Sequence, residues 1–71
     1  MEVSIKLEYR DKCYDADWSS FTDKEVSGIR DLMKRIAIGD GNYLRFKMGG
    51  HSVYFGEKIL QESIITIRTK N

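Results

Sequence analysis

TDKEVSGIRDLMKRIAIG, residues 22–39, is the strongest helix signal in this 71-residue chain. Thr22 and Glu25 have the spacing of a capping box, in which each side chain accepts a hydrogen bond from the backbone N–H of the other residue. Apolar side chains then recur at spacings of three and four, the period of an amphipathic helix. This stripe consists of Val26, Ile29, Met33 and Ile36, with Leu32 and Ala37 beside it. We predict one helix that ends near Gly39, and a turn over residues 38–42.

Residues 2–10 alternate strictly between apolar and polar side chains, which indicates a strand with one buried and one solvated face. The predicted solvated side chains are Glu2, Ser4, Lys6, Glu8 and Arg10. Asp11-Lys12 is the candidate two-residue turn, although Asp-Lys is a poor sequence for a primed turn. A hairpin closed there places three core-facing pairs opposite each other, Tyr9 with Tyr14, Leu7 with Ala16 and Ile5 with Trp18. It also places Lys6 favourably opposite Asp17 and Glu8 unfavourably opposite Asp15.

Residues 43–56 predict a second hairpin, because Gly49-Gly50 can adopt the positive φ angles of a type I′ or II′ turn. Folding at these glycines pairs Met48 with His51, Phe46 with Val53 and Leu44 with Phe55 on the core face. The outer face receives Tyr43, Arg45, Lys47, Ser52 and Tyr54, with Arg45 opposite Tyr54.

The chain ends in a predicted strand, Ser63 to Thr69, in which Ile65 and Ile67 face the helix and Arg68 points outward. Residues 57–62 connect it to the second hairpin. The predicted fold is therefore α+β, with a single antiparallel sheet of four to five strands and one amphipathic helix packed on one face. The element order is ββαβββ within one small domain, residues 1–71, and the strand order stays open.

Charge and cysteine content limit the class of protein. The net charge is +1, but residues 1–40 carry nine acidic and seven basic side chains, whereas residues 41–71 carry two and five. The single cysteine excludes an internal disulfide and suits the reducing cytoplasm. There is no basic signal-peptide region and no apolar run of transmembrane length. We expect a soluble cytoplasmic protein without a membrane partner.

The side chains with catalytic potential do not form a recognisable site. His51 and Cys13 are the single residues of their types and lie far apart in the sequence, whereas a zinc site needs three or four ligands. We expect His51 to be a half-buried structural residue, and Asp15 and Asp17 to be solvated. Trp18 is either a core anchor or an interface residue. The chain is predicted not to be an enzyme, with no catalytic residue, metal or cofactor.

Basic and aromatic side chains are interleaved on the predicted outer face of the second half of the sheet. If the last three strands are neighbours, this face combines cations for phosphate contacts with rings for base stacking, as single-stranded nucleic-acid binders do. The net charge is much smaller than that of a dedicated binder, and a solvated face without a ligand is the alternative. The candidate binding residues are Tyr43, Arg45, Lys47, Tyr54 and Arg68.

No motif of a known family is present. In composition the chain resembles the small proteins of phages and mobile elements in Gram-positive bacteria, which are compact, rich in lysine and isoleucine and free of catalytic motifs. The resemblance implies a protein that modulates a host protein, or nucleic acid, without catalysis. The leading hypothesis is a non-enzymatic interaction module that binds another macromolecule, or a second copy as a homodimer, through an exposed sheet face or edge. The alternative is a weak single-stranded nucleic-acid binder that uses the basic and aromatic face.

Overall fold

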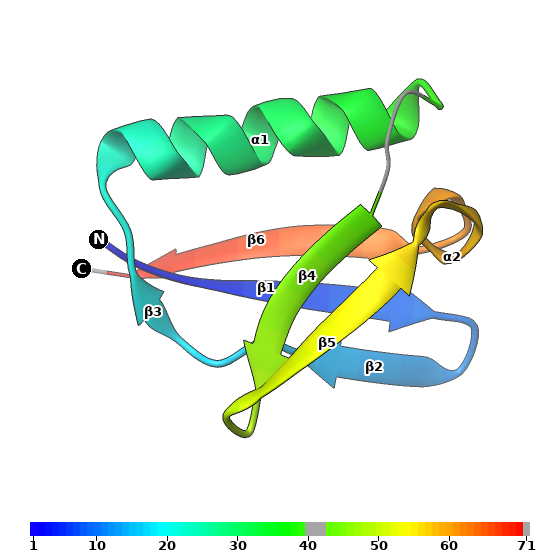
Figure 1. Ribbon diagram of the computed structural model, residues 1–71, viewed down its shortest axis with the longest axis horizontal. Coiled ribbons are helices and arrows are strands. Elements are labelled where there is room, and N and C mark those ends of the chain that lie inside the picture. Colours follow the sequence, from blue (N-terminus) through cyan, green and yellow to red (C-terminus); the bar gives the residue numbers. More distant parts are fainter. Residues whose placement is uncertain (40–42, 71) are drawn as a thin grey trace.

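The computed structural model describes residues 1–39 and 43–70. Within these residues the chain is α+β, as predicted, but its strands form two antiparallel sheets instead of one. One sheet contains β1, β2, β3 and β6, and the other contains β4 and β5 (Figure 1). The elements in chain order are β1 Glu2–Tyr9, β2 Lys12–Asp15, β3 Ser19–Ser20, α1 Asp23–Ala37, β4 Tyr43–Met48, β5 His51–Gly56, α2 Glu57–Gln61 and β6 Ile64–Lys70.

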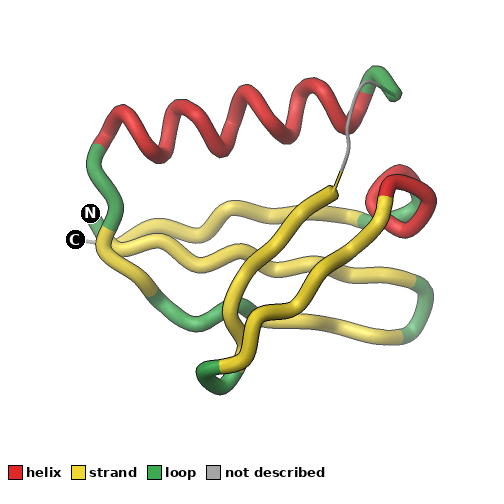
Figure 2. The backbone as a smooth tube through the Cα atoms, in the orientation of Figure 1, coloured by secondary structure: helices red, strands yellow, loops and turns green. Residues whose placement is uncertain are grey.

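The prediction of a single sheet is wrong because β6 does not join the second hairpin. The predicted element order ββαβββ differs from the observed one because it lacks β3 and α2. Strand β6 pairs with β1 over nearly its whole length, from Glu2 opposite Lys70 to Glu8 opposite Ile64. This pairing brings the two ends of the chain together (Figure 2). The short helix α2 reverses the chain between β5 and β6 and buries Leu60. The added β3 pairs with the start of β1.

Helix α1 agrees with the sequence prediction. The Thr22 N–H donates to Glu25 Oε1 over 3.0 Å and the Glu25 N–H donates to Thr22 Oγ1 over 3.2 Å, which completes the capping box. At the other end, the Gly39 N–H donates to the Ile36 carbonyl, and Gly39 has a φ of 80°. Residues 40–42 of the predicted turn lie outside the described residues. The helix runs alongside the larger sheet (Figures 1 and 2), and its half-buried Ile29, Leu32 and Met33 pack against the hydrophobic core.

The hydrophobic core lies where the larger sheet, the helices and the β4–β5 hairpin meet. Phe55 is central to it, because its ring centroid lies 5.2 Å from the rings of both Tyr14 on β2 and Phe46 on β4. The core therefore joins the two sheets through side chains. Its buried members are Ile5, Leu7, Ala16, Ile36, Leu44, Phe46, Phe55 and Leu60.

The first hairpin has a different register from the predicted one. Tyr9 pairs with Lys12 and Leu7 with Tyr14, so that the turn is Arg10-Asp11, with Arg10 at a φ of 57°. This is a shift of two residues, which keeps each side chain on its predicted face. It also replaces the like-charge Glu8–Asp15 pair, because Lys6 now lies opposite Asp15.

Trp18 is not a core residue. The β1–β2 pairing and the β1–β3 pairing differ in register by one residue, because Leu7 pairs with Tyr14 whereas Val3 pairs with Ser19. One additional residue therefore lies between β2 and β3, and a shift by one moves a side chain to the opposite face. Trp18 is 39% exposed, and its ring lies 4.2 Å from Lys70 Nζ.

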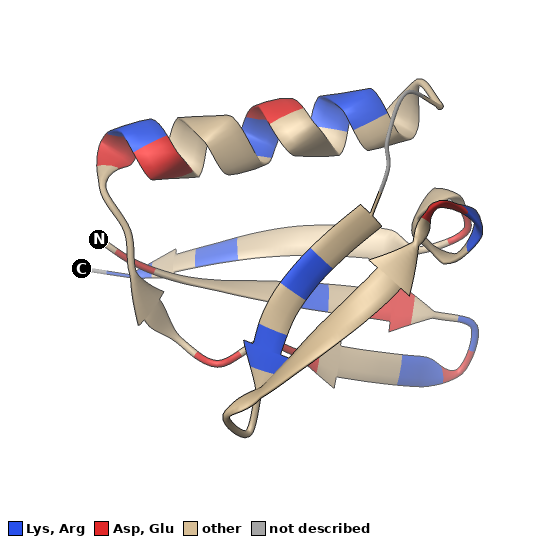
Figure 3. Ribbon diagram, viewed as in Figure 1, with Lys and Arg blue, Asp and Glu red and all other residues tan. Residues whose placement is uncertain are grey.

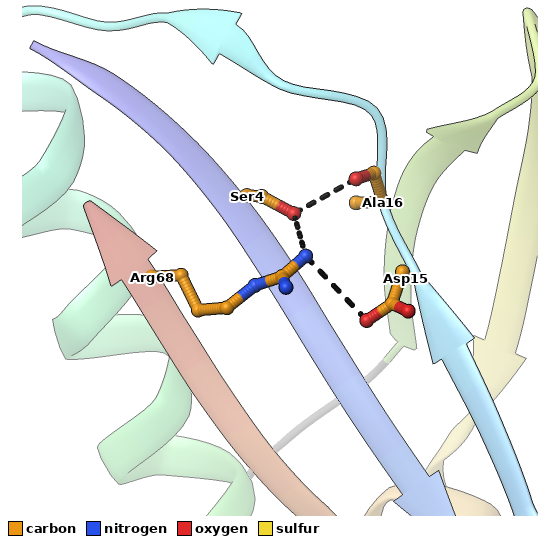
Figure 4. A network of polar contacts seen from close by, with 4 residues as sticks. All are labelled: Ser4, Asp15, Ala16 and Arg68. Carbon is orange, nitrogen blue, oxygen red and sulfur yellow. Dashed lines mark hydrogen bonds and ion pairs between the residues drawn. The ribbon is translucent and has the colours of Figure 1, made fainter. Parts of the chain in front are cut away.

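The same rearrangement buries Ser4, which was predicted to be solvated. Its hydroxyl donates to the Ala16 carbonyl over 2.8 Å and accepts a hydrogen bond of the same length from Arg68 Nη2. Arg68 also pairs with Asp15 over 3.4 Å (Figure 4). Its guanidinium carbon lies 5.3 Å from the centre of the Trp18 ring. The outer face of the larger sheet is thus covered at this point by the segment that leads from β2 to β3.

Candidate binding groove along strand β4

The second hairpin has the predicted register throughout, including Arg45 opposite Tyr54 and Lys47 opposite Ser52. Tyr43 and Tyr54 are 56% and 62% exposed, and their ring centroids lie 6.0 Å apart. Arg45 and Lys47 are also exposed on this face. Figure 3 shows the two basic positions on β4 and no acidic position on β4 or β5. The structure therefore brings four of the five candidate residues together.

Arg68 is the candidate residue that lies elsewhere. Because β6 pairs with β1, its outward side chains belong to the outer face of the larger sheet, and the assumption that the last three strands are neighbours is wrong. Arg68 contacts Ser4 and Asp15 there (Figure 4). It also lies against the ring of Trp18. These contacts hold the guanidinium against its own sheet, so that Arg68 has a structural role in this arrangement.

A groove of about 880 Å³ runs beside β4, between this strand, β1 and α1. It is lined by apolar side chains of all three elements and by polar side chains from β4 and the segment around β3. The groove has no signal in the sequence, because its walls come together only through the packing of two sheets and a helix. The apolar lining residues include Val3, Ile5, Ile29, Leu32, Leu44 and Phe46, and the polar ones include Asp17, Ser19, Arg45 and Lys47.

The edge of β4 that does not face β5 carries free backbone groups. In an antiparallel hairpin with a two-residue turn, hydrogen-bonded pairs alternate with non-hydrogen-bonded pairs, starting with a bonded pair at Met48 and His51. The backbone groups of Tyr43, Arg45 and Lys47 therefore point away from β5. The Asp17 N–H confirms this geometry by donating to the Lys47 carbonyl over 2.7 Å. Within residues 1–39 and 43–70, no hydrogen bond reaches the N–H or carbonyl of Arg45.

The chain was compared with family models, curated proteins and solved structures. None of the three comparisons finds a match. The groove and the strand beside it are therefore the features of this chain that bear on its function.

Asp17 fixes the tip of the second hairpin to the larger sheet. Its Oδ1 accepts from the Gly49 N–H over 2.9 Å and its Oδ2 accepts from the Gly50 N–H over 3.0 Å. Both glycines have positive φ angles, as a type I′ turn requires. The hydrogen bond from the Gly50 N–H lowers the pKa of Asp17 most, followed by the one from the Gly49 N–H. The positive charge of Lys47 lowers this pKa further. Asp17 thereby positions β4 relative to β1 and closes one end of the groove.

We expect Asp17→Asn to reduce stability at neutral pH, because the neutral amide loses the charge-assisted hydrogen bonds to the turn. The pKa of Asp17 is lowered on folding, so its stabilisation is present above the ordinary value of 3.8 and is lost as the pH falls through the lower value of the folded state. Urea unfolding of both proteins at several pH values measures this. The difference in the free energy of unfolding between wild type and Asp17→Asn should become smaller below about pH 4. A difference that stays constant down to pH 2 would contradict the role of the charge.

Asp31→Asn is the matched control for this experiment. Asp31 is exposed on α1 and takes part in no side-chain hydrogen bond or ion pair among the residues that the structure describes. Its replacement should change the free energy of unfolding at neutral pH by less than about 0.5 kcal/mol, as is usual at the surface.

The remaining candidate residues do not form a chemical site. His51 is exposed and not half-buried as predicted, because it lies beside the turn at the hairpin tip. Cys13 is exposed on β2. The described part of the chain contains no cluster of three or more metal-ligating side chains, and none of its helices has the length and apolar character needed to cross a membrane. A second cavity, of about 560 Å³, lies between α1, α2 and the start of β6.

Proposed function

We propose that this protein is a non-enzymatic interaction module that binds an extended segment of another protein along the free edge of β4. The observation that carries the proposal is the unpaired backbone of Arg45, which lies on the strand edge that borders an apolar groove. An extended peptide can add to such an edge as a further strand, with main-chain hydrogen bonds providing affinity and alternate side chains providing specificity.

The dimensions of the groove support this mode of binding. Residues 43–47 line it as one continuous stretch of strand. Because the Asp17 N–H already donates to the Lys47 carbonyl, an added antiparallel strand would pair with residues 43–46, and at about 3.4 Å per residue it would extend over roughly 14 Å. One face of such a strand would cover half-buried Ile29 and Leu32 on α1. The burial of apolar side chains would thus add to the backbone hydrogen bonds.

Arg45→Pro tests the proposal, because proline removes the N–H that points to the free edge. The β4–β5 hydrogen bonds should survive, since Arg45 belongs to a non-hydrogen-bonded pair and proline is tolerated on an edge strand. Random octapeptides displayed on phage are selected on the wild-type protein, and the enriched peptides are measured against both variants at Arg45. We expect at least a tenfold loss of affinity for Arg45→Pro and a smaller loss for Arg45→Ala.

Controls separate loss of the edge from loss of the fold. Amide NMR spectra should show that Arg45→Pro leaves Phe55 and Leu7 in their native environments. Tyr43→Pro is a second variant of the same kind, because Tyr43 also belongs to a non-hydrogen-bonded pair and its N–H points to the free edge. If no peptide is enriched, or if the enriched peptides bind both proline variants as tightly as the wild type, binding at the β4 edge is excluded.

A second candidate function uses the outer face of the same hairpin. The exposed rings of Tyr43 and Tyr54 lie side by side, and neither Arg45 nor Lys47 has an ion-pair partner in the described part of the chain. This arrangement favours weak binding of single-stranded nucleic acid through stacking and phosphate contacts. Titration with a labelled mixed-sequence oligonucleotide should then show an affinity that falls steeply with salt and is lost in the Arg45→Ala/Lys47→Ala double variant. Retained affinity in that variant would exclude this face.

A further inference from the structure

We infer that the segment bound along β4 is acidic and alternates apolar with acidic residues. This inference rests on the proposed function and specifies the chemistry of the partner. Side chains on an added strand share the faces of the residues that they lie opposite. The added side chains therefore divide into a set beside Leu44 and Phe46, which face the core, and a set beside Tyr43, Arg45 and Lys47, which face outward.

The inward-facing side chains of the added strand would lie in an apolar environment. Leu44 and Phe46 are buried core residues, and the groove next to them is lined by Val3 and Ile5 of β1 and by Ile29 of α1. A charged side chain placed there would lose its hydration without gaining a partner. Every second residue of the bound segment should therefore be apolar.

The outward-facing side chains of the added strand would lie next to the positive charges of β4. Arg45 and Lys47 are exposed, and no acidic residue occurs in β4 or β5. Asp17 is the acidic residue that lines the groove, and its two carboxylate oxygens accept hydrogen bonds from the Gly49-Gly50 turn. Opposite charges on neighbouring strands attract, so acidic residues are favoured beside Arg45 and Lys47.

The same charges argue against a second copy of this chain as the occupant. Pairing of two β4 edges would bring the basic side chains of both copies onto one face, where like charges repel. The outward face of β4 thus favours an acidic strand over a second copy of this chain. A partner with an acidic, extended segment matches the groove on both faces.

Four synthetic seven-residue peptides test the inference. Three have valine at every second position, with glutamate, threonine or lysine between, and the fourth contains the residues of the glutamate peptide with its valines contiguous. Affinity and binding site are measured from amide NMR shifts at 20 and 300 mM salt. We expect the glutamate peptide to bind about tenfold more tightly than the lysine peptide at low salt, with shifts at Arg45 and protection of its N–H from exchange.

Variants assign the effect to the named charges. Arg45→Ala and Lys47→Ala should each reduce the affinity for the glutamate peptide toward that for the threonine peptide, whereas Lys58→Ala on α2 should not. Equal binding of the glutamate and threonine peptides at β4 overturns the charge inference and leaves the proposed function standing. If the peptide with contiguous valines binds as tightly as the glutamate peptide, the bound segment does not need alternating apolar residues, and that part of the inference is wrong. If all four peptides leave the amide shifts of β4 unchanged, the proposed function itself fails.

Discussion

Phe55→Ala should lower the free energy of unfolding by about 3–5 kcal/mol, the range for removing a buried phenylalanine side chain. Phe55 belongs to β5, yet its ring packs against Tyr14 of the larger sheet as well as Phe46 of its own hairpin. Its loss leaves a cavity at the junction of the two sheets and also removes two aromatic contacts. Urea unfolding followed by circular dichroism measures the change. An unchanged m-value would show that the variant and the wild type expose similar surface areas on unfolding.

Tyr54→Ala is the neighbouring control, because Tyr54 lies on the same strand and is 62% exposed. Its replacement should cost less than about 0.5–1 kcal/mol, since it leaves no buried cavity. If the two substitutions destabilised the protein equally, Phe55 would not be the residue that joins the two sheets. The junction would then have to depend on backbone contacts such as that between Asp17 and Lys47.

Leu7→Ala is the second substitution with a large expected effect, a loss of about 2–5 kcal/mol. Leu7 lies in the middle of the central strand, is completely buried, and has Tyr14 opposite it on one side and Ile65 on the other. A chain of 71 residues is expected to have a total stability of roughly 4–11 kcal/mol. The substitution would therefore remove a large part of the stability, and thermal unfolding should show a pronounced decrease in Tm.

Ile64→Ala is the matched control for Leu7. Ile64 begins β6 opposite Glu8 and is 67% exposed, so the removal of its side chain leaves no cavity. We expect a change within about 0.5 kcal/mol. A loss at Ile64 as large as the loss at Leu7 would contradict the assignment of the two faces of the larger sheet.

Helix α1 and the second hairpin were predictable in detail because their signals are local. The capping box and apolar period determine where α1 begins and which side it buries. Gly49-Gly50 determines the turn, and the turn determines every pair of the hairpin. Tyr43, Arg45, Lys47 and Tyr54 were therefore placed together correctly from the sequence.

The first hairpin shows where local signals become insufficient. Two registers that differ by two residues bury the same face, so the apolar pattern could not distinguish them. The predicted register paired Lys6 with Asp17 and Glu8 with Asp15, whereas the observed one pairs Lys6 with Asp15 and Glu8 with Cys13. The one-residue shift before β3, which turns Trp18 outward toward Arg68, has no comparable local signal.

The sequence by itself determined the α+β class, the position of the helix, the second hairpin and the face on which four candidate residues lie. Only the tertiary structure decided that β6 pairs with β1, that Arg68 therefore leaves this face, and that a groove opens beside β4. The physical reason is the range of the interactions. Capping, periodicity and turn geometry act over a few residues, whereas strand pairing between residues 56 to 68 positions apart depends on how the whole core packs.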